Sequence, residues 1–340
     1  MIKEAIGKLV EGESLAQHEA ALVMEEIMAG EATPAQLGAF ICVLRAKGET
    51  VDEIAGLAAT MRARAVPVVT SRQVVDTCGT GGDSRGTFNI STAAAFVAAA
   101  AGVAVAKHGN RAMSSRCGSA DVLEALGANV NLTADQAARC LDEVGICFMF
   151  APLYHPAMRH AAGPRRELGI RTVFNVLGPL TNPAGARAQV LGVPERALAA
   201  KMAGALQRLG AHHALVVHGL DGVDEVTITG PTLVYEVREG NVEEYVVTPE
   251  DFGFASAPLA SIGGGTAEDN ARTIREVLAG AGGPRRQVVL LNAAAALVAG
   301  DVAADLAEGV RLSADAIDRG AAASALARFI AFSQRAAALC

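Results

Sequence analysis

The sequence predicts an α/β protein in which a small all-helical domain precedes a larger domain with a mostly parallel central sheet. Residues 1–66 carry apolar side chains at helical spacing, and from Val74 onward short β-branched runs alternate with helical segments. This alternation is typical of a parallel sheet covered by helices. Residues 155–185 interrupt it with a Gly-Pro break and loop signals. The predicted domains are a helical one over 1–70, completed in space by about 155–187, and an α/β one over 71–154 and 188–340.

The N-terminal segment divides into helices with recognisable ends. Ser14 is placed to cap a helix that begins at Leu15, with Gln17 as its capping-box partner. Thr33-Pro34 and Thr50-Val51 have the composition of two further helix starts. The three predicted helices end at Gly30, near Gly48 and before Pro67.

Short runs rich in β-branched and apolar residues are the strand candidates of the larger domain. They are Val74-Val75, Val103–Ala106, Ile146–Phe150, Leu215–His218, Val226–Thr229, Leu233–Val237 and Val288–Leu291. Two helices between them carry cap signals. Ser119 precedes one that ends at Gly127, and Thr133 with Gln136 begins another that ends at Gly145. The alanine-rich stretch 293–340 is expected to form buried helices.

The composition is that of a soluble protein with a large core. The 340 residues are 51% hydrophobic and carry a formal net charge of −7, which argues against nucleic acid or an anionic membrane as a partner. The longest apolar run, Ala93 to Ala106, is interrupted by Gly102 and is too short to span a bilayer. The six cysteines form no CxxC pair and no signal peptide is visible, so we expect a cytoplasmic location.

A glycine-rich turn follows the first strand candidate. Gly79-Thr80-Gly81-Gly82 permits positive φ and close backbone approach, so several N–H groups can converge on phosphate oxygens. It is not a Walker loop, which would need Gly-Lys-Ser/Thr, and it is not a dinucleotide fingerprint, because Ser84 stands where the last glycine would be. Alone, the turn is explained equally well as a plain strand-to-helix connection. The polar residues that follow favour a phosphate site: Asp83, Thr87, Asn89, Ser91 and Thr92.

Two further features supply positive potential. Ser91-Thr92 open an alanine-rich helix, whose N-terminal N–H groups and dipole favour an anion. Lys107-His108-Gly109-Asn110-Arg111 follows a strand candidate, and ligands of open α/β sheets bind at the carboxyl ends of strands. A solvated charged turn is the alternative for this second segment. Together these residues indicate an enzyme that handles a pyrophosphorylated substrate.

Carboxylates and arginines complete the set of candidates. Asp224-Glu225 follows the strand candidate Leu215–His218, and adjacent carboxylates suit Mg²⁺, whose remaining positions are filled by phosphates and water. A solvated acidic turn is the alternative. Arg165 and Arg166 lie in the interrupting segment, and either guanidinium could grip a substrate carboxylate through two parallel hydrogen bonds. The spacing does not choose between them.

At the level of whole motifs the sequence resembles the anthranilate phosphoribosyltransferase family, which shares its fold with nucleoside phosphorylases. The resemblance runs essentially the full length and keeps the order and spacing of the family's motifs. These are DTCGTGGD at 76–83, TFNIST at 87–92, KHGNRAMSS at 107–115, GSAD at 118–121 and GIRTVFNVLGPLTN at 169–182. Ser84-Arg85 and Cys117 are less usual choices, and neither falls on a matched ligand position.

The resemblance implies a step of tryptophan biosynthesis, in which the 5-phosphoribosyl group of 5-phosphoribosyl 1-diphosphate is transferred to the amine of anthranilate and pyrophosphate is released. It also implies a homodimer, bound Mg²⁺ and an active site in the hinge cleft between the domains. The Mg²⁺ positions match Ser91, Asp224 and Glu225, and the anthranilate positions match Gly79, Asn110 and Arg165, since the family's register selects Arg165 over Arg166. The phosphoribosyl-diphosphate positions match Gly79, Gly82, Asp83, Thr87, Asn89, Ile90, Ser91, Thr92, Lys107, His108, Gly109, Asn110, Arg111, Ala112, Met113, Ser114, Ser115 and Ser119.

This reaction needs little activation of the nucleophile. Once the charge of the diphosphate is taken up, the ribose carbon develops oxocarbenium character, and an aromatic amine already carries an available lone pair. We therefore assign no general base and keep His108 as a candidate for orienting the amine. Positioning and electrostatics are expected to carry catalysis.

Two other functions are compatible with the predicted fold. A nucleoside phosphorylase would bind a base and phosphate and would need no carboxylate clamp, so Arg165, Asn110 and the Asp224-Glu225 pair argue against it. A nucleic-acid-binding relative without transferase activity should show a basic excess and eroded motifs. Here the net charge is −7 and the motifs are intact.

Overall fold

A seven-stranded sheet organises the larger part of the chain in the computed structural model, which describes residues 1–83, 85–112 and 116–338. The strand order is β3-β2-β1-β4-β5-β6-β7. The first five are parallel, whereas β6 and β7 pair antiparallel at one edge. The strands are β1 (Val74–Gly79), β2 (Ala104–Gly109), β3 (Ile146–Phe150), β4 (Ala188–Gly192), β5 (His213–Gly219), β6 (Thr232–Arg238) and β7 (Asn241–Val247).

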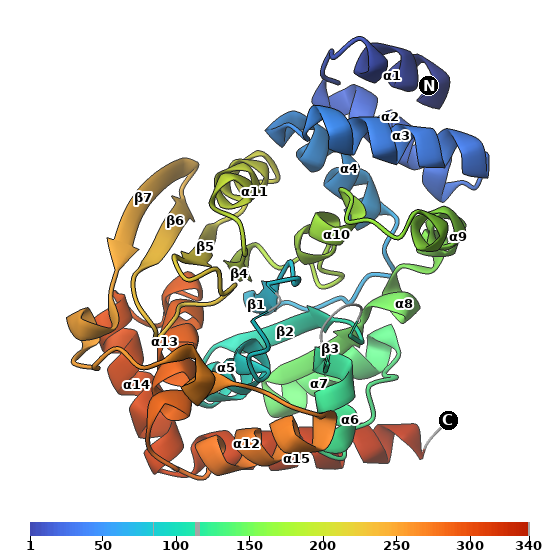
Figure 1. Ribbon diagram of the computed structural model, residues 1–340. Helices are drawn as coiled ribbons and strands as arrows, with labels where there is room; N and C mark the ends of the chain where they lie inside the picture. Colours follow the sequence, from blue (N-terminus) through green and yellow to red (C-terminus); the bar gives the residue numbers. More distant parts are fainter. Residues whose placement is uncertain (84, 113–115, 339–340) are drawn as a thin grey trace.

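Helices cover both faces of this sheet and form a separate bundle at the N-terminus (Figure 1). The bundle lies at the far side of α11 from the strands, and the C-terminal helices lie beneath the opposite face. The helices are α1 (Ile2–Val10), α2 (Gln17–Met28), α3 (Pro34–Lys47), α4 (Val51–Ala63), α5 (Ile90–Ala100), α6 (Ser119–Ala125), α7 (Ala134–Val144), α8 (Ala151–Tyr154), α9 (Arg159–Leu168), α10 (Phe174–Leu177), α11 (Arg196–Arg208), α12 (Ala267–Leu278), α13 (Pro284–Ala299), α14 (Leu306–Asp318) and α15 (Ala321–Ala337).

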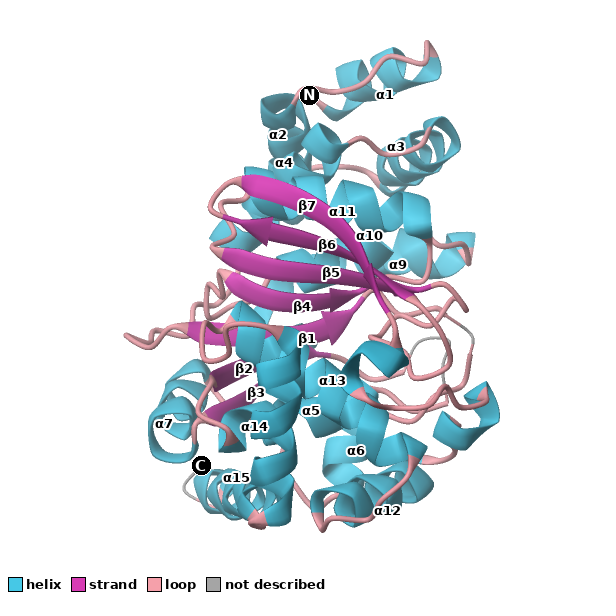
Figure 2. Ribbon diagram, turned by 90° about the vertical axis from the view of Figure 1, so that its left-hand side faces the viewer, coloured by secondary structure: helices cyan, strands magenta, loops and turns pink. Residues whose placement is uncertain are grey.

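The sheet separates two hydrophobic cores. Along β5, Leu215 and Val217 belong to the core that contains α5 and α13, whereas Ala214 and Val216 belong to the core that contains α11 and the N-terminal bundle. This division follows from the period of two along a strand. Because both faces are covered (Figure 2), the central strands are apolar on both sides and read as continuous hydrophobic runs. The predicted α/β fold class is confirmed.

The N-terminal helices begin where side chains satisfy their first N–H groups. Thr50 caps α4, since its side chain accepts from the Glu53 N–H, and the side chain of Glu53 accepts in return from the Thr50 N–H. The predicted cap at Ser14 is wrong. The helix begins at Gln17, because Ala16 is its N-cap and donates its backbone N–H to Glu19 at 2.9 Å. At the start of α6 the cap is Gly118, and Ser119 is the first helical residue.

Two predicted strands are not strands. Val288–Leu291 lies inside α13, which begins at Pro284 and is buried on all sides from Val288 to Ala299, so no helical period appears in this part of its sequence. Val226–Thr229 is loop; there the Asn292 side chain pairs with both backbone groups of Val226, each at 2.9 Å. Conversely, β4 and β7 are not among the predicted strands, and β1 and β2 both run beyond their predicted ends, to Gly79 and Gly109. The helix between Thr133 and Gly145 is confirmed with its capping box.

The segment after β3 leaves the sheet and joins the N-terminal bundle. Its helix α9 packs on α2 and α3, and α10 packs on α4. The segment also returns to the sheet, because the His155 ring lies beside that of His108 in β2 and Asn182 donates to Asp76 in β1. Arg171 donates to the loop that follows β1. The division of the chain at residues 70, 155 and 187 stays a prediction. Over the residues that the structure describes, no helix is long and apolar enough to cross a membrane.

Candidate active site

The carboxyl ends of β1 and β4 meet the loop that follows β5. A Cβ on Gly79, the last residue of β1, would lie 2.6 Å from the Asp224 carboxylate, and one on Gly192 would lie 1.6 Å from the Asp224 carbonyl oxygen. Thr80 donates its N–H to the Gly192 carbonyl at 2.9 Å. The two glycines are therefore required by close approach, and they allow an acidic loop to seat directly on the ends of the strands.

The glycine loop is held from two sides. Gly81 and Gly82 have φ of +64° and +81°, which only glycine adopts readily. The Gly81 N–H donates to Asp224 Oδ2 at 3.2 Å, and the Gly81 carbonyl accepts from the Arg171 guanidinium at 2.9 Å. Arg171 also covers Gly82, because a Cβ there would lie 1.4 Å from its Nη1. The loop thus spans from the sheet to the 155–187 segment.

Helix α5 directs its N-terminus at the same place. Its N-cap is Asn89, whose side chain donates to the Cys117 carbonyl at 3.2 Å and accepts from Asn270 at 2.9 Å, so it does not cap its own helix. The Ser91 N–H donates to Glu225 Oε1 at 3.1 Å. Thr92 Oγ1 is buried and has no hydrogen-bond partner in the part of the chain described. The helix end therefore presents N–H groups that suit an anion.

Lys107 lies buried between β1 and the start of α5. Its ammonium group donates to the Thr77 carbonyl and to Ser91 Oγ, the latter at 3.3 Å. Desolvation lowers its pKa, and the negative charge of Asp76 opposes this. Asp76 accepts from the His108 N–H at 3.1 Å and from the Asn182 side chain at 2.8 Å, and burial raises its pKa to about 6. A buried cation is thus fixed close to the carboxyl end of β2.

Three carboxyl groups crowd the cleft. Desolvation and the neighbouring charge of Asp83 raise the pKa of Asp224 to about 7. Desolvation and the charge of Asp224 raise the pKa of Glu225 well above its usual range. The pKa of Asp83 is raised by desolvation as well, and its Oδ2 is buried without a partner among the described residues. Such a group of acids is unfavourable unless a cation compensates it.

The donor set fits a hard divalent cation that keeps much of its own coordination shell. Within the described ranges no group of three or more His, Cys, Asp or Glu side chains is arranged as a ready metal cage. Mg²⁺ is commonly held by one or two carboxylates while substrate phosphates and water supply the rest. Asp224 and Glu225, together with the hydroxyl of Ser91, are chemically suited to that role.

His108 faces away from solvent and toward a second histidine. Its ring centroid lies 5.0 Å from that of His155, and its Nε2 is buried with no hydrogen-bond partner in the described part of the chain. Desolvation and the nearby His155 lower the pKa of His108 to about 3. The imidazole is therefore neutral near pH 7 and can orient a group by one hydrogen bond but cannot deliver a proton as an imidazolium.

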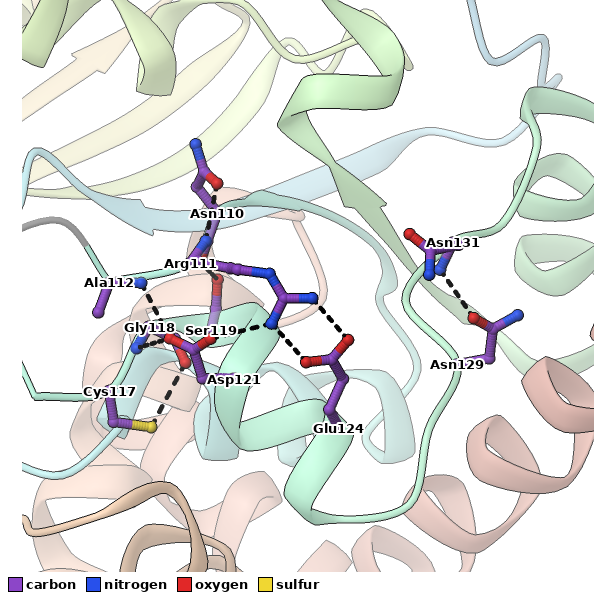
Figure 3. Close-up of polar contacts among 10 residues, drawn as sticks. All are labelled: Asn110, Arg111, Ala112, Cys117, Gly118, Ser119, Asp121, Glu124, Asn129 and Asn131. Carbon is purple, nitrogen blue, oxygen red and sulfur yellow. Dashed lines mark hydrogen bonds and ion pairs between the residues drawn. The ribbon is translucent and has the colours of Figure 1, made fainter. Parts of the chain in front are cut away.

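The loop after β2 is tied to helix α6 (Figure 3). Asp121 accepts the backbone N–H groups of Ala112 and Gly118 at 2.9 and 2.8 Å. Arg111 forms two hydrogen bonds with Glu124, at 2.5 and 2.8 Å, and a third with Asp121 at 3.2 Å. The predicted phosphate contacts Met113, Ser114 and Ser115 lie outside the described residues.

The remaining predicted residues are distributed around this cleft. Ser119 Oγ donates to the Asn110 carbonyl at 3.3 Å, and a Cβ on Gly109 would lie 2.2 Å from that Oγ. Thr87 forms an isolated bridge with Gly263. Asn110 is exposed, and Figure 3 shows its side chain directed away from the Arg111 guanidinium.

The two arginines of α9 differ in their surroundings. Arg165 is partly buried and its guanidinium lies 5.1 Å from the centroid of the Phe174 ring, whereas Arg166 is exposed. Desolvation lowers the pKa of Arg165, although a guanidinium remains charged at any working pH. A partly desolvated, stacked guanidinium is well suited to bind a carboxylate.

Sequence reasoning alone does not single out four residues that support the site: Asp76, Asp121, Arg171 and Asn182. Each stands in a motif noted above. Asp121 contacts the N-cap of its own helix, Gly118, whereas the contacts of the other three residues reach distant parts of the chain. Asp76 and Asn182 form a hydrogen bond although they are 106 positions apart in the sequence. Arg171 donates a hydrogen bond to Gly81, which lies 90 positions before it. Only the fold brings such pairs together.

The chain is similar to proteins of one kind along its whole length. The α/β domain of the glycosyl transferase family matches residues 71–323, and the helical bundle domain of that family matches residues 3–65. The anthranilate phosphoribosyltransferase of Moorella thermoacetica is 59% identical over 98% of this chain and 98% of its own length. That of Chloroflexus aggregans is 60% identical over the same shares.

Solved structures show the same similarity. The crystal structure of anthranilate phosphoribosyltransferase from Thermus thermophilus has a TM-score of 0.92 at 48% identity and covers 97% of this chain and 99% of that one. The Saccharomyces cerevisiae enzyme in complex with PRPP and Mg has a TM-score of 0.89 at 28% identity over 98% of both chains. The same yeast enzyme in complex with 4-fluoroanthranilate has a TM-score of 0.88 at 26% identity over 98% of both.

Proposed function

This chain belongs to the glycosyl transferase family and, within it, to the anthranilate phosphoribosyltransferases, and from this premise we propose that it transfers the 5-phosphoribosyl group of 5-phosphoribosyl 1-diphosphate to the amine of anthranilate. The products are N-(5-phosphoribosyl)anthranilate and pyrophosphate, in a step of L-tryptophan biosynthesis. One observation carries the proposal: in a chain similar to these enzymes over its full length, a glycine loop, a helix N-terminus, a buried lysine and an acidic pair converge on one end of the sheet.

The diphosphate and the ribose phosphate are proposed to bind to the loops that follow β1 and β2. The glycine loop supplies N–H groups near Gly79 to Asp83, and α5 supplies its N-terminus from Asn89 to Thr92. Lys107 lies beside Ser91 and contributes a positive charge that burial makes more effective. The loop from Gly109 to Ser115, with Ser119, completes the set and includes the three positions outside the described residues.

Mg²⁺ is the proposed cofactor, held by Asp224 and Glu225 with the Ser91 hydroxyl. The crowding of these acids and the unpartnered Asp83 oxygen, among the residues described, support it, as does the presence of Mg with PRPP in the yeast enzyme. Bound Mg²⁺ would neutralise the charge that develops on the leaving diphosphate.

Anthranilate is proposed to bind on the side of the cleft that is formed by the 155–187 segment. Arg165 is proposed to bind its carboxylate through two parallel hydrogen bonds, and Asn110 and Gly79 to line the ring and amine. Binding of 4-fluoroanthranilate to the yeast enzyme supports a site of this size and chemistry. The neutral His108 is proposed to orient the amine, because with a pKa of about 3 it has no proton to donate near pH 7.

Catalysis then consists of positioning and electrostatics. The bond from C1 to the diphosphate oxygen breaks as the amine lone pair forms the new C–N bond, and the amine loses a proton to water. Lys107 and the backbone N–H groups stabilise the departing negative charge, while Arg165 fixes the nucleophile in line with C1. We further propose a homodimer in the cytoplasm, with the hinge between the domains, divided near residues 70, 155 and 187, closing over both substrates.

The test follows anthranilate fluorescence after addition of 5-phosphoribosyl 1-diphosphate, with and without Mg²⁺, and measures released pyrophosphate. We expect a Mg²⁺-dependent loss of fluorescence with stoichiometric pyrophosphate. No loss from a folded protein would contradict the proposal, and an assay with nucleoside plus phosphate would then test the phosphorylase. A nucleic-acid titration would test the second alternative.

A further inference from the structure

The two acidic residues of the cleft occupy backbone groups that a diphosphate needs. Asp224 Oδ2 accepts the Gly81 N–H at 3.2 Å, and Glu225 Oε1 accepts the Ser91 N–H at 3.1 Å. The first donor belongs to the glycine loop and the second to the N-terminus of α5. Each is a preferred donor to phosphate oxygens, and each is engaged by a carboxyl group of the same chain.

The backbone of the acidic loop cannot withdraw to free these donors. A Cβ on Gly192 would lie 1.6 Å from the Asp224 carbonyl oxygen, so the loop sits directly on the end of β4. Asn292 holds both backbone groups of Val226, the residue after Glu225, at 2.9 Å. Release of the Gly81 and Ser91 N–H groups therefore requires the side chains of Asp224 and Glu225 to turn.

Binding of a divalent cation would favour this rotation of the Asp224 and Glu225 side chains. Asp83, Asp224 and Glu225 repel one another in a poorly solvated cleft, and the Asp83 Oδ2 has no partner among the described residues. A cation between them relieves the repulsion and gives the carboxylates a better partner than an N–H group. Free diphosphate lacks this cation and would add its own negative charge beside theirs.

We infer that Asp224 and Glu225 make the site selective for the Mg²⁺ complex of the diphosphate over free diphosphate, because their side chains occupy its N–H donors until Mg²⁺ draws them away. This inference rests on the proposed function. It assigns the pair two opposite effects on one ligand: they exclude diphosphate without Mg²⁺ and recruit it with Mg²⁺. A pair that only ligated the metal would repel free diphosphate by its charge but would not compete for the N–H donors, so without Mg²⁺ the Ala variants would gain no more than the Asn and Gln variants.

The test is a calorimetric titration of the full chain with inorganic pyrophosphate at pH 8.5, once in EDTA and once in excess Mg²⁺. Asp224→Ala and Glu225→Ala should bind Mg²⁺-free pyrophosphate at least about tenfold more tightly than wild type, since a close like charge and a competitor for the N–H are both removed. With Mg²⁺ they should bind at least about tenfold more weakly. Asp224→Asn and Glu225→Gln should show a smaller gain in EDTA, because the amide oxygen still accepts the N–H.

Glu143→Ala is the matched control. It removes one negative charge from the exposed face of α7, where Glu143 pairs with Arg139 and Arg335, and should leave both titrations unchanged. Melting curves identify any variant that folds poorly, and the isosteric Asn and Gln variants then carry the test. Variants that bind Mg²⁺-free pyrophosphate no more tightly than wild type would overturn the inference alone. A wild-type chain that binds no pyrophosphate even with Mg²⁺ would overturn the proposed function as well.

Discussion

The two ends of the same sheet carry charged clusters of opposite character. At the carboxyl end of β1, desolvation raises the pKa of Asp83, and desolvation together with the charge of Asp83 raises the pKa of Asp224 to about 7. At the amino end of β5, the side chain of His213 is 1% exposed and has one ring nitrogen 3.2 Å from Asp301 and the other 2.8 Å from Glu236. A hydrogen bond from His213 lowers the pKa of Glu236.

The charged cluster at the amino end of β5 contributes to the stability of the fold, whereas the acids at the carboxyl end of β1 serve ligand binding. Although desolvation opposes it, hydrogen bonds from His212, Gln73 and His213 lower the pKa of Asp301, so the charges of this far cluster stabilise the fold. The charges of the cleft destabilise it, because burial raises the pKa values of its acids, and the proposed Mg²⁺ would compensate them.

The largest effect is expected from the double change Asp224→Asn with Glu225→Gln. It should lower kcat/KM by about 10²–10³-fold and shift the Mg²⁺ dependence to higher concentration, because the cation loses its charged ligands. The same change should raise the melting temperature above neutral pH, since a carboxyl with a raised pKa destabilises the fold once it ionises. Initial rates across a Mg²⁺ titration and a thermal scan at pH 8 measure both. An unaltered Mg²⁺ titration would exclude these residues as ligands.

Arg165→Ala is expected to act on one substrate. It should raise the KM for anthranilate about 10–100-fold, because a charge-assisted bidentate contact is lost, and leave the affinity for 5-phosphoribosyl 1-diphosphate nearly unchanged. Arg166→Ala, at the exposed neighbour on α9, is the matched control and should change neither constant. A large loss of phosphoribosyl-diphosphate affinity with an unchanged anthranilate KM would refute the role.

The residues of the candidate site can be predicted from the sequence more readily than the residues that hold them in place. The amino-acid composition of three segments is unusual for a plain turn, and the fold brings all three to one end of the sheet. They are Gly79–Asp83, Lys107 and Asp224-Glu225. Arg171 and Asn182 could not be placed, because their contacts cross 90 and 106 positions of chain. Nothing local in a sequence encodes a contact of that span.

The same limit explains the errors in the fold. The sequence predicts a strand at Val288–Leu291, inside α13, because a helix buried on every side shows no period. β7 (Asn241–Val247) escapes prediction because it is an edge strand whose side chains are mostly exposed and include the adjacent Glu243 and Glu244, and charged residues on an edge discourage unwanted pairing. Helices with a Thr cap and a Gln or Glu three residues on have correctly predicted starts, since that signal is local.

Glu236→Gln tests the far cluster. Glu236 accepts from His213 Nε2 at 2.8 Å and from the Tyr245 hydroxyl at 2.7 Å, so its loss should reduce the free energy of unfolding by about 1–2 kcal/mol at pH 8. Because its folded pKa lies below the ordinary value of 4.5, this contribution is present above that value and is lost as the pH falls further. Denaturation with urea at pH 8 and pH 3 measures the difference. A loss of similar size at both pH values, or a fall in kcat/KM, would contradict the separation of the two ends.

The smallest effect is expected at Arg171, which joins the cleft end to the 155–187 segment without carrying charge into the acidic group. It donates to the Gly81 carbonyl at 2.9 Å, and because a peptide's C=O and N–H point in opposite directions, this contact also fixes where the Gly82 N–H points. Arg171→Ala should therefore raise the KM for 5-phosphoribosyl 1-diphosphate about three- to tenfold with little change in kcat, and Arg171→Lys should recover part of it.

Gly82→Ala provides the partner for a double-mutant cycle with Arg171→Ala. Alone it should cost more than the arginine change, because its Cβ would lie 1.4 Å from Arg171 Nη1 and the residue keeps a φ of +81°. In the double variant the clash is removed and only the backbone strain remains, so the combined loss should be smaller than the sum. Strict additivity in the KM would mean that Arg171 does not hold the glycine loop and that the loop is positioned from the sheet side alone.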